Sequence, residues 1–176
     1  MLEKQAHLGK MDLYFADETR FSELGYSPYG WQKKEENISI NVCRGESINC
    51  FGLYSKDHRF IYRLQKETFK SDNIVEILDS FSFELKKPTM VVLDNAKIHT
   101  AKNVLSRIQI WQKRGLFIFK LPPYSPQLNI IERLWKELKE GWLRPKDYCS
   151  ADDLFFAVNR ICNNVGKQIF LKHQTY

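Results

Sequence analysis

The chain has 176 residues, and its 27 Lys and Arg residues outnumber its 21 Asp and Glu residues, giving a net charge of +6 and a pI near 9.1. This length supports one hydrophobic core and leaves no room for a second full domain. A hydrophobic fraction of 43% with 14% aromatic residues excludes a disordered chain. The positive charge favours polyanionic partners, nucleic acids among them, through attraction and counterion release.

The first half of the chain predicts strands followed by a helix. Residues 11–16 (MDLYFA) form a predicted strand that runs directly into Asp17 and Glu18, so a carboxylate is expected at the end of that strand. Residues 38–43 and 48–54 predict a hairpin joined through residues 44–46, and residues 60–64 predict a further strand. The apolar spacing over residues 72–85 then indicates a helix.

The middle of the chain predicts a strand, helix, strand unit. Residues 89–93 are almost continuously apolar, which is typical of a strand buried on both faces, and this strand ends at Asp94. An apolar stripe indicates a helix that begins at Ala101 and is ended by Gly115, and residues 116–121 again predict a buried strand. Such a unit requires a parallel crossover, so the sheet is expected to be mixed.

Two further helices are predicted after a proline-rich connector. Asn129 is placed to cap the first of them, Glu132 lies in its first turn, and its apolar stripe consists of Ile131, Leu134, Trp135, Leu138 and Trp142. The last helix begins at Ser150 with a capping-box pattern to Asp153, and its apolar face is predicted to run on to Ile169.

Three acidic residues stand where metal-dependent phosphoryl chemistry would need them. Hard divalent cations prefer oxygen ligands, and two-metal chemistry gathers carboxylates around a pair of ions. Asp17 and Asp94 follow strands, and Glu132 begins a helix. Each also has an ordinary interpretation: a solvated turn for Asp17, a strand-to-helix loop for Asp94, and favourable interaction with the helix dipole for Glu132.

The sequence contexts of these acids carry a family resemblance. Residues 14–21 (YFADETRF), 92–99 (VLDNAKIH) and 121–135 (LPPYSPQLNIIERLW) occur in one chain. Together they strongly resemble the DDE transposases of mariner-like bacterial insertion sequences, over about residues 11–145. The third block is the most specific, because a proline connector, Tyr-Ser-Pro, Leu-Asn and Glu-x-x-Trp coincide in it.

The resemblance implies an α/β fold of the ribonuclease H-like, retroviral integrase-like type, with a mixed sheet flanked by helices. It implies that Asp17, Asp94 and Glu132 are the catalytic residues and the ligands of two Mg²⁺ or Mn²⁺ ions. The implied partners are double-stranded DNA at transposon ends and in the target, with a homodimer expected. The implied organisation is an N-terminal extension over residues 1–10 and a single catalytic domain over residues 11–176.

Two features depart from the family pattern. Ile130 stands where the family commonly has a proline two residues before the third acid, and the interval between Asp94 and Glu132 is longer than the commonest spacing. The resemblance also implies a helix-turn-helix region that reads transposon ends. Only about ten residues precede the first predicted strand here, so the chain is expected to be a catalytic fragment, a second reading frame or a decayed element.

Several other residues have both a functional and a structural interpretation. Asn95 and His99 fall on recurrent family positions and are candidates for positioning a phosphate or a water. Arg133, Lys136 and Lys139, with Arg144 and Lys146 beyond them, would line a DNA groove or simply form a solvated face. Trp31 is the best tryptophan candidate for DNA contact, whereas Trp111, Trp135 and Trp142 lie on apolar stripes and are predicted to be core.

Two alternative functions remain open from sequence. One is a catalytically silent DNA-binding or assembly module derived from a transposase, and the other is a nuclease acting on RNA hybrids. Because gathered carboxylates repel one another, at least one of the three acids is expected to have a raised pKa, and Asp94→Asn is expected not to destabilise the metal-free domain.

The remaining sequence features concern compartment and metals. No signal-peptide stretch or membrane-length apolar run is present, so we expect a cytoplasmic protein with no membrane partner. The family resemblance implies that it is prokaryotic and nucleoid-associated. The four cysteines lack C-x-x-C spacing, so we expect no zinc site and expect them to serve as small core residues.

Overall fold

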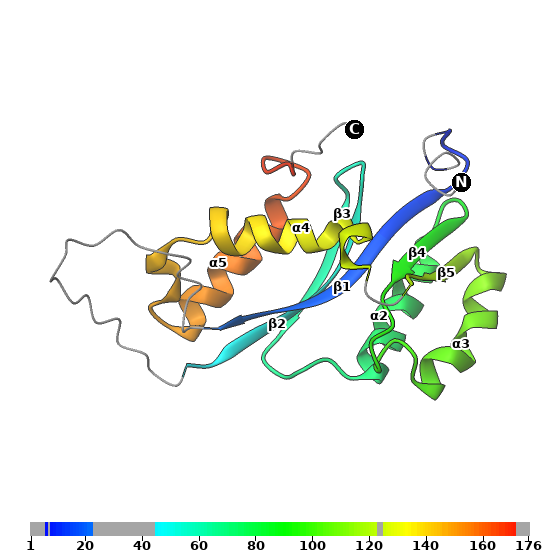
Figure 1. Cartoon of the computed structure of the whole chain (residues 1–176), viewed down its shortest axis with the longest axis horizontal. Coiled ribbons are helices and arrows are strands. Elements are labelled where there is room, and N and C mark those ends of the chain that lie inside the picture. The colour runs from blue at the N-terminus through cyan, green and yellow to red at the C-terminus, as the bar shows by residue number, and fades with distance from the viewer. Residues whose placement is uncertain (1–5, 7, 23–44, 123–124, 172–176) are drawn as a thin grey trace, which may run out of the picture.

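The computed structural model describes residues 6, 8–22, 45–122 and 125–171. Its centre is a five-stranded mixed sheet in the order β3-β2-β1-β4-β5 (Figure 1). Strands β1 (Asp12–Ser22), β2 (Ser47–Ser55) and β3 (Phe60–Gln65) are antiparallel neighbours, while β4 (Thr89–Leu93) and β5 (Leu116–Lys120) run parallel to β1. The mixed α/β sheet predicted from the alternation of elements is confirmed.

Strand β1 is longer than predicted, and this changes the position of the first acid. The strand continues through Asp17 to Ser22, so Asp17 lies inside it and pairs with Gly52 of β2. The prediction that the strand ends before Asp17 is therefore wrong. The cause is long-range pairing, because residues 47–55 extend β1 by hydrogen bonding along its whole second half. The predicted strand at 38–43, and with it that hairpin, lies outside the described residues.

The predicted strand, helix, strand unit is present. Helix α2 (Ser71–Phe83) precedes β4 and ends two residues before its predicted limit, and helix α3 (Lys102–Lys113) connects β4 to β5 by the expected parallel crossover. Gly115 has φ of +88°, a left-handed conformation that favours glycine after a helix, as predicted.

The C-terminal half is helical, with one correction to the predicted limits. Helix α4 (Ile130–Glu137) passes into the π-helical turn η2 (Leu138–Trp142), and the short η1 (Pro126–Leu128) and η3 (Pro145–Tyr148) flank this segment. Helix α5 (Ala151–Asn164) begins at Ser150, whose hydroxyl accepts from the Asp153 amide, as the capping box predicts. It ends at Asn164, so the prediction that it includes Ile169 is wrong.

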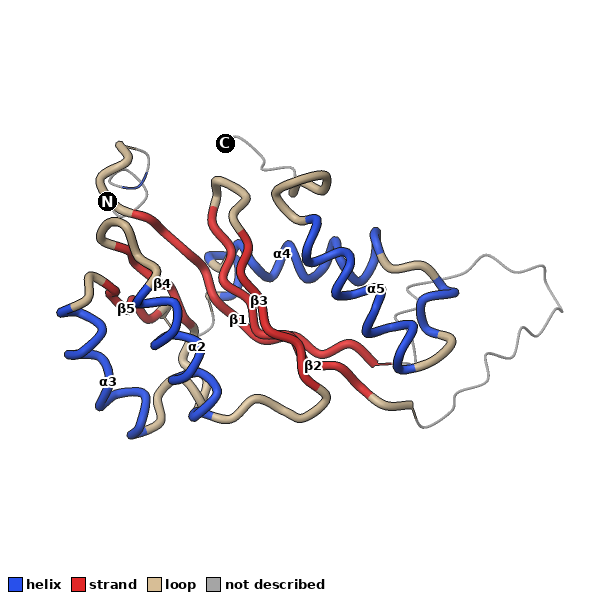
Figure 2. The backbone as a smooth tube through the Cα atoms, turned by 180° about the vertical axis from the view of Figure 1, so that it is seen from behind, coloured by secondary structure: helices blue, strands red, loops and turns tan. Residues whose placement is uncertain are grey.

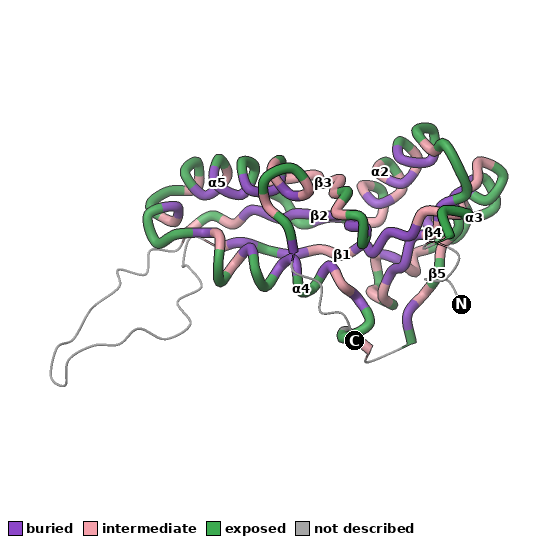
Figure 3. The backbone as a smooth tube through the Cα atoms, turned by 90° about the horizontal axis from the view of Figure 1, so that it is seen from above, coloured by how far each residue is buried: buried purple, intermediate pink, exposed green. Residues whose placement is uncertain are grey.

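Two apolar clusters cover the two faces of the sheet. Leu13, Phe15 and Phe21 of β1 pack with α4 and α5, whereas Tyr14 and Ala16 pack with α2 and α3, as the alternation of a strand requires. Figure 2 shows β1 and β2 reaching from the α2 and α3 end of the molecule to the α5 end, and Figure 3 shows the buried residues concentrated along the strands and the inner sides of the helices.

The cysteines are free where they are described. Cys50 and Cys162 are buried core residues as predicted, but Cys149 is exposed, and Cys43 lies outside the described residues. None of the described helices has the length and apolar character needed to cross a membrane.

Candidate active site

The pairing of β1 with β4 brings the first two acids together. The two strands are parallel, and Phe15 pairs with Val92. Asp17 and Asp94 each stand two residues beyond that pair, and side chains two residues apart on a strand point to the same face. Asp17 therefore lies on the face covered by α4, with Asp94 beside it at the end of β4.

Helix α4 brings the third acid to the same place. Its residues Ile131, Leu134 and Trp135 are buried in the core cluster beneath it, which leaves Glu132 exposed in the first turn beside β1. Asn129 stands at the N-cap position, but its side chain does not cap the helix as predicted. Instead its Nδ2 donates to the carbonyl oxygen of Ala16 at 3.3 Å, which ties the start of α4 to the residue before Asp17.

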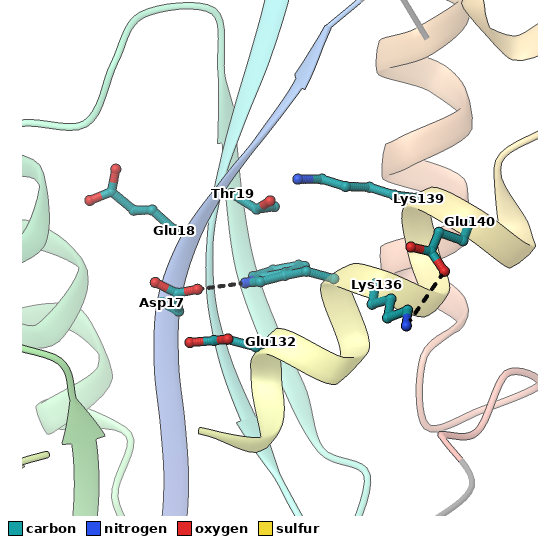
Figure 4. Close-up of a pocket in the computed structure, with 8 residues that line it drawn as sticks. Asp17, Glu18, Thr19, Glu132, Lys136, Lys139 and Glu140 are labelled. Carbon is teal, nitrogen blue, oxygen red and sulfur yellow. Dashed lines mark hydrogen bonds and ion pairs between the residues drawn. The ribbon is translucent and has the colours of Figure 1, made fainter. Parts of the chain in front are cut away.

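A solvent-accessible hollow of about 330 Å³ opens between β1 and α4. Figure 4 shows Asp17 and Glu132 facing the space between the strand and the helix, with Glu18 pointing away to the other side of β1. Acids, lysines, one threonine and one indole line this hollow: Asp17, Glu18, Thr19, Glu132, Trp135, Lys136, Lys139 and Glu140.

Asp17 is the most perturbed of the three acids. Its pKa is raised to about 7, first by burial and then by the charges of Asp94 and Glu132, while a hydrogen bond from the Glu18 backbone opposes the rise. The predicted elevation of at least one pKa is confirmed, although burial contributes more than repulsion. Glu132 also has a raised pKa, caused first by burial and then by the charge of Asp94.

Asp94 has the opposite environment. Its Oδ1 accepts from the Ala96 amide at 3.0 Å and lies 2.6 Å from His99 Nδ1. Because an ionised carboxylate can only accept, Nδ1 donates this bond. The His99 hydrogen bond lowers the Asp94 pKa, with a further contribution from the Ala96 amide against the effect of burial. Both contacts use Oδ1.

The two auxiliary residues both have partners inside the protein. His99 is buried, with only 2% of its side chain exposed, and its bonded partner is Asp94 rather than open solvent. Asn95 donates through Nδ2 to the Leu121 carbonyl oxygen at 2.5 Å, which joins the turn after β4 to the end of β5. Contact of either side chain with a phosphate or water stays a prediction.

Of the basic residues predicted to contact DNA, Lys136 and Lys139 line the hollow and Arg133 does not. Lys139 lines the hollow half-buried, and burial lowers its pKa while the charge of Asp17 opposes that effect. Lys136 also lines it, 3.9 Å from Glu140, whereas Arg133 is exposed on α4 outside the lining. Trp31 lies outside the described residues.

One contact in the site was missed from sequence. Trp135 is buried as predicted, but its Nε1 donates to Asp17 Oδ2 at 3.2 Å. The available signal was the Glu-x-x-Trp spacing, because residues three apart on a helix share a face and Glu132 had already been placed at the site.

The carboxylates offer hard oxygen ligands that suit Mg²⁺ or Mn²⁺. Asp17 and Glu132 line one hollow, and the charge of Asp94 acts on both of them. Within the described part of the chain, no three His, Cys, Asp or Glu side chains already surround the position of a single ion. Mg²⁺ does not require such a cage, since it is commonly held by one or two carboxylates, waters and substrate phosphates. The donor chemistry therefore fits a divalent cation that is completed by substrate.

Comparison with solved structures shows the fold. The chain is similar to the catalytic core of BIV integrase (TM-score 0.56, 12% identity, covering 92% of this chain and 87% of that one). It is also similar to the HTLV-2 integrase catalytic core in complex with magnesium (TM-score 0.56, 12% identity, covering 93% and 92%). In the pre-cleavage Mos1 transpososome the match has a TM-score of 0.60 at 14% identity, covering 92% of this chain and 52% of that chain.

These similarities confirm the ribonuclease H-like, integrase-like fold predicted from sequence, and this chain spans about half the length of the Mos1 chain. No curated protein matches the sequence. The family described as DDE superfamily endonuclease matches residues 12–154, a span that contains Asp17, Asp94 and Glu132. The chain therefore belongs to the DDE superfamily endonucleases.

Proposed function

We propose that this chain is the catalytic core of a transposase, which cleaves DNA phosphodiesters at transposon ends and joins the resulting 3′ hydroxyl to target DNA. Family membership supports nuclease and strand-transfer chemistry. The observation that carries the proposal is that Asp17 and Glu132 line one hollow and that the charge of Asp94 acts on both. The pKa of Asp17 is raised first by burial and then by the charges of Asp94 and Glu132.

In this proposal the three carboxylates hold two Mg²⁺ or Mn²⁺ ions. Bound metals would supply an activated nucleophile and stabilisation of the leaving oxygen. Asp94, kept ionised by His99 and Ala96, presents an already charged ligand. Burial raises the pKa of Asp17. The residue would lose its proton when cations bind, because an adjacent positive charge favours the ionised carboxylate.

The cationic side chains suit a DNA partner. Lys136 and Lys139 line the same hollow as the acids, so a phosphate drawn to them would lie beside the carboxylates. The Mos1 structures are described as a strand transfer complex and a pre-cleavage transpososome, and the HTLV-2 core as a dimeric form. We propose double-stranded DNA as substrate and a homodimer as the working assembly here.

The proposal is tested by conservative removal of each acid. Asp17→Asn, Asp94→Asn and Glu132→Gln should each reduce Mn²⁺-dependent nicking of supercoiled plasmid DNA by at least about a hundredfold, because each removes charge from the place where the transition state is stabilised. Glu137→Gln is the matched control, since Glu137 is an exposed acid of the same helix outside the hollow. Nicking, Mn²⁺ binding by calorimetry and melting temperature would be measured for every variant.

The outcomes separate the alternatives. Mn²⁺ binding without nicking of any DNA would favour a catalytically silent module. Faster cleavage of an RNA–DNA hybrid than of the matched DNA duplex would favour a nuclease for hybrids. Parental nicking by any of the three variants, provided that the variant is folded, would remove that acid from the proposed site.

A further inference from the structure

We propose that Trp135 is a positioning residue for Asp17, and that its indole N–H, not only its packing, holds the carboxylate in the orientation that binds metal. This inference rests on the proposed function, since it assumes that Asp17 is a ligand. Trp135 was predicted to be a core residue, and its ring is indeed 4% exposed. Its Nε1, however, is directed at Asp17 Oδ2 at 3.2 Å.

The indole is held from several sides. The Phe60 ring of β3 packs against it edge to face with centroids 5.8 Å apart, and Ile131 and Leu134 of its own helix are buried in the same cluster. An indole N–H can only donate, and burying it without an acceptor costs free energy. The fixed ring therefore has one available direction for its hydrogen, and Asp17 is the acceptor there.

Gly52 provides the space that makes this contact possible. It pairs with Asp17 across β1 and β2, so a side chain at this position would stand on the face covered by α4. A Cβ placed on Gly52 would lie 2.8 Å from the Trp135 ring and 2.7 Å from the Phe60 ring, closer than carbon atoms approach. The absence of a side chain at position 52 lets the indole lie over β2 and reach the neighbouring strand.

The consequence for Asp17 is a carboxylate with restricted rotation. Its two donors are the indole of Trp135 and the backbone N–H of Glu18. A ligand that is already oriented loses less entropy when metal binds than one that must be ordered. Partners that orient metal ligands typically contribute roughly tenfold to a hundredfold to metal affinity.

The test is a double-mutant cycle on Mn²⁺ affinity, measured by calorimetry on the whole chain without DNA. Trp135→Phe keeps an aromatic ring and removes the donor, and it should weaken Mn²⁺ binding by roughly tenfold or more. In an Asp17→Asn background the same substitution should cause no further loss, because the partner it orients is gone. Replacing Trp135 with benzothienylalanine, which keeps the bicyclic shape without the N–H, should reproduce the loss if Trp135→Phe folds poorly.

Trp111 offers a matched control elsewhere in the fold. It is fully buried, and its Nε1 donates to Asp79 Oδ1 at 2.8 Å, so Trp111→Phe also removes an indole bond to a carboxylate. It should lower the melting temperature and leave Mn²⁺ affinity unchanged. Parental affinity in the benzothienylalanine protein, or a loss that persists in the Asp17→Asn background, would overturn the role of Trp135. Unchanged affinity in Asp17→Asn alone would instead refute Asp17 as a ligand.

Discussion

At the scale of single residues, the surroundings of Asp17 and Asp94 shift their pKa values in opposite directions. Asp94 accepts hydrogen bonds from His99 and the Ala96 amide, which lower its pKa, whereas burial raises the pKa of Asp17 to about 7. Neighbouring groups with pKa values driven apart are typical of sites that hold charge for chemistry. In the metal-free protein the ionised form of Asp17 is therefore destabilising, whereas the ionised form of Asp94 is stabilised by its hydrogen bonds.

This difference predicts how stability depends on pH in the metal-free protein. The folded pKa of Asp17, about 7, lies above the ordinary 3.8, so the folded state keeps a proton that the unfolded chain loses. Stability should fall as pH rises between those values and level off above 7. Asp17→Asn should remove that loss, with a gain of up to about 4 kcal/mol at pH 8 for a shift of about 3 units and little gain near pH 4.

Urea unfolding with a chelator present, followed from pH 4 to 8, would measure this gain. Asp94→Asn is the comparison, and it should be destabilising above the Asp94 pKa because it weakens the bond from His99. This reverses the expectation from sequence that Asp94→Asn leaves the metal-free domain as stable as the parent. A gain for Asp17→Asn that does not change with pH would contradict the assignment of a raised pKa.

At the scale of elements, α4 joins the core and the site. Its buried stripe packs on the sheet, and this packing helps to set the position of Glu132 and the direction of the Trp135 indole. The Asn129 side chain bonded to Ala16 fixes the start of the helix relative to β1. Substitutions that move α4 away from the sheet should therefore disturb stability and metal binding together.

Gly52→Ala tests this dependence. The added methyl group would meet the Trp135 and Phe60 rings at less than 3 Å, so we expect destabilisation of about 1–3 kcal/mol, as for overpacked cores, and weaker Mn²⁺ binding. Gly141→Ala is the control, because its Cβ would meet only Glu137 at 3.5 Å, an ordinary contact. Urea unfolding and calorimetry would measure both effects. If Gly52→Ala were as stable as the parent, the Trp135 and Phe60 rings would have to move aside without a loss of folding free energy.

At the scale of the whole molecule, charge and extent set what this chain does with DNA. It carries a net charge of +6, and Lys136 of α4 and Lys139 of η2 line the same hollow as Asp17 and Glu132. It spans about half the length of the Mos1 chain to which it is similar. Phosphate contacts position a protein on DNA without reading sequence.

We therefore predict that this chain binds duplex DNA weakly, with little sequence preference and steep weakening by salt. Lys136→Ala and Lys139→Ala should each reduce the slope of log affinity against log salt by about 1, as expected for one lost phosphate contact. Lys113→Ala, an exposed lysine at the end of α3, should leave the slope unchanged. Fluorescence anisotropy across a salt series would measure this. Tight, salt-insensitive binding to one sequence would refute the prediction.

The elements whose signals are local were predictable from sequence. The apolar run of β4, the stripe and terminal glycine of α3, the strand β5 and the capping box of α5 each depend on residues within a few positions of one another. The three motif blocks also indicated the ribonuclease H-like fold and the family before any contact was known. The family-specific acids were identified in the same way, and their catalytic roles remain predictions.

Tertiary structure decided what depends on pairing between distant segments. Asp17 looked like the end of a strand because an acidic pair follows an apolar run, yet β2 pairs with β1 beyond it and keeps it in the strand. The register of β1 against β4, the direction of the Trp135 ring, and the space left by Gly52 involve residues far apart in sequence. Local sequence patterns do not predict such contacts. They are stabilised by tertiary packing, which forms only when α4 docks on the sheet.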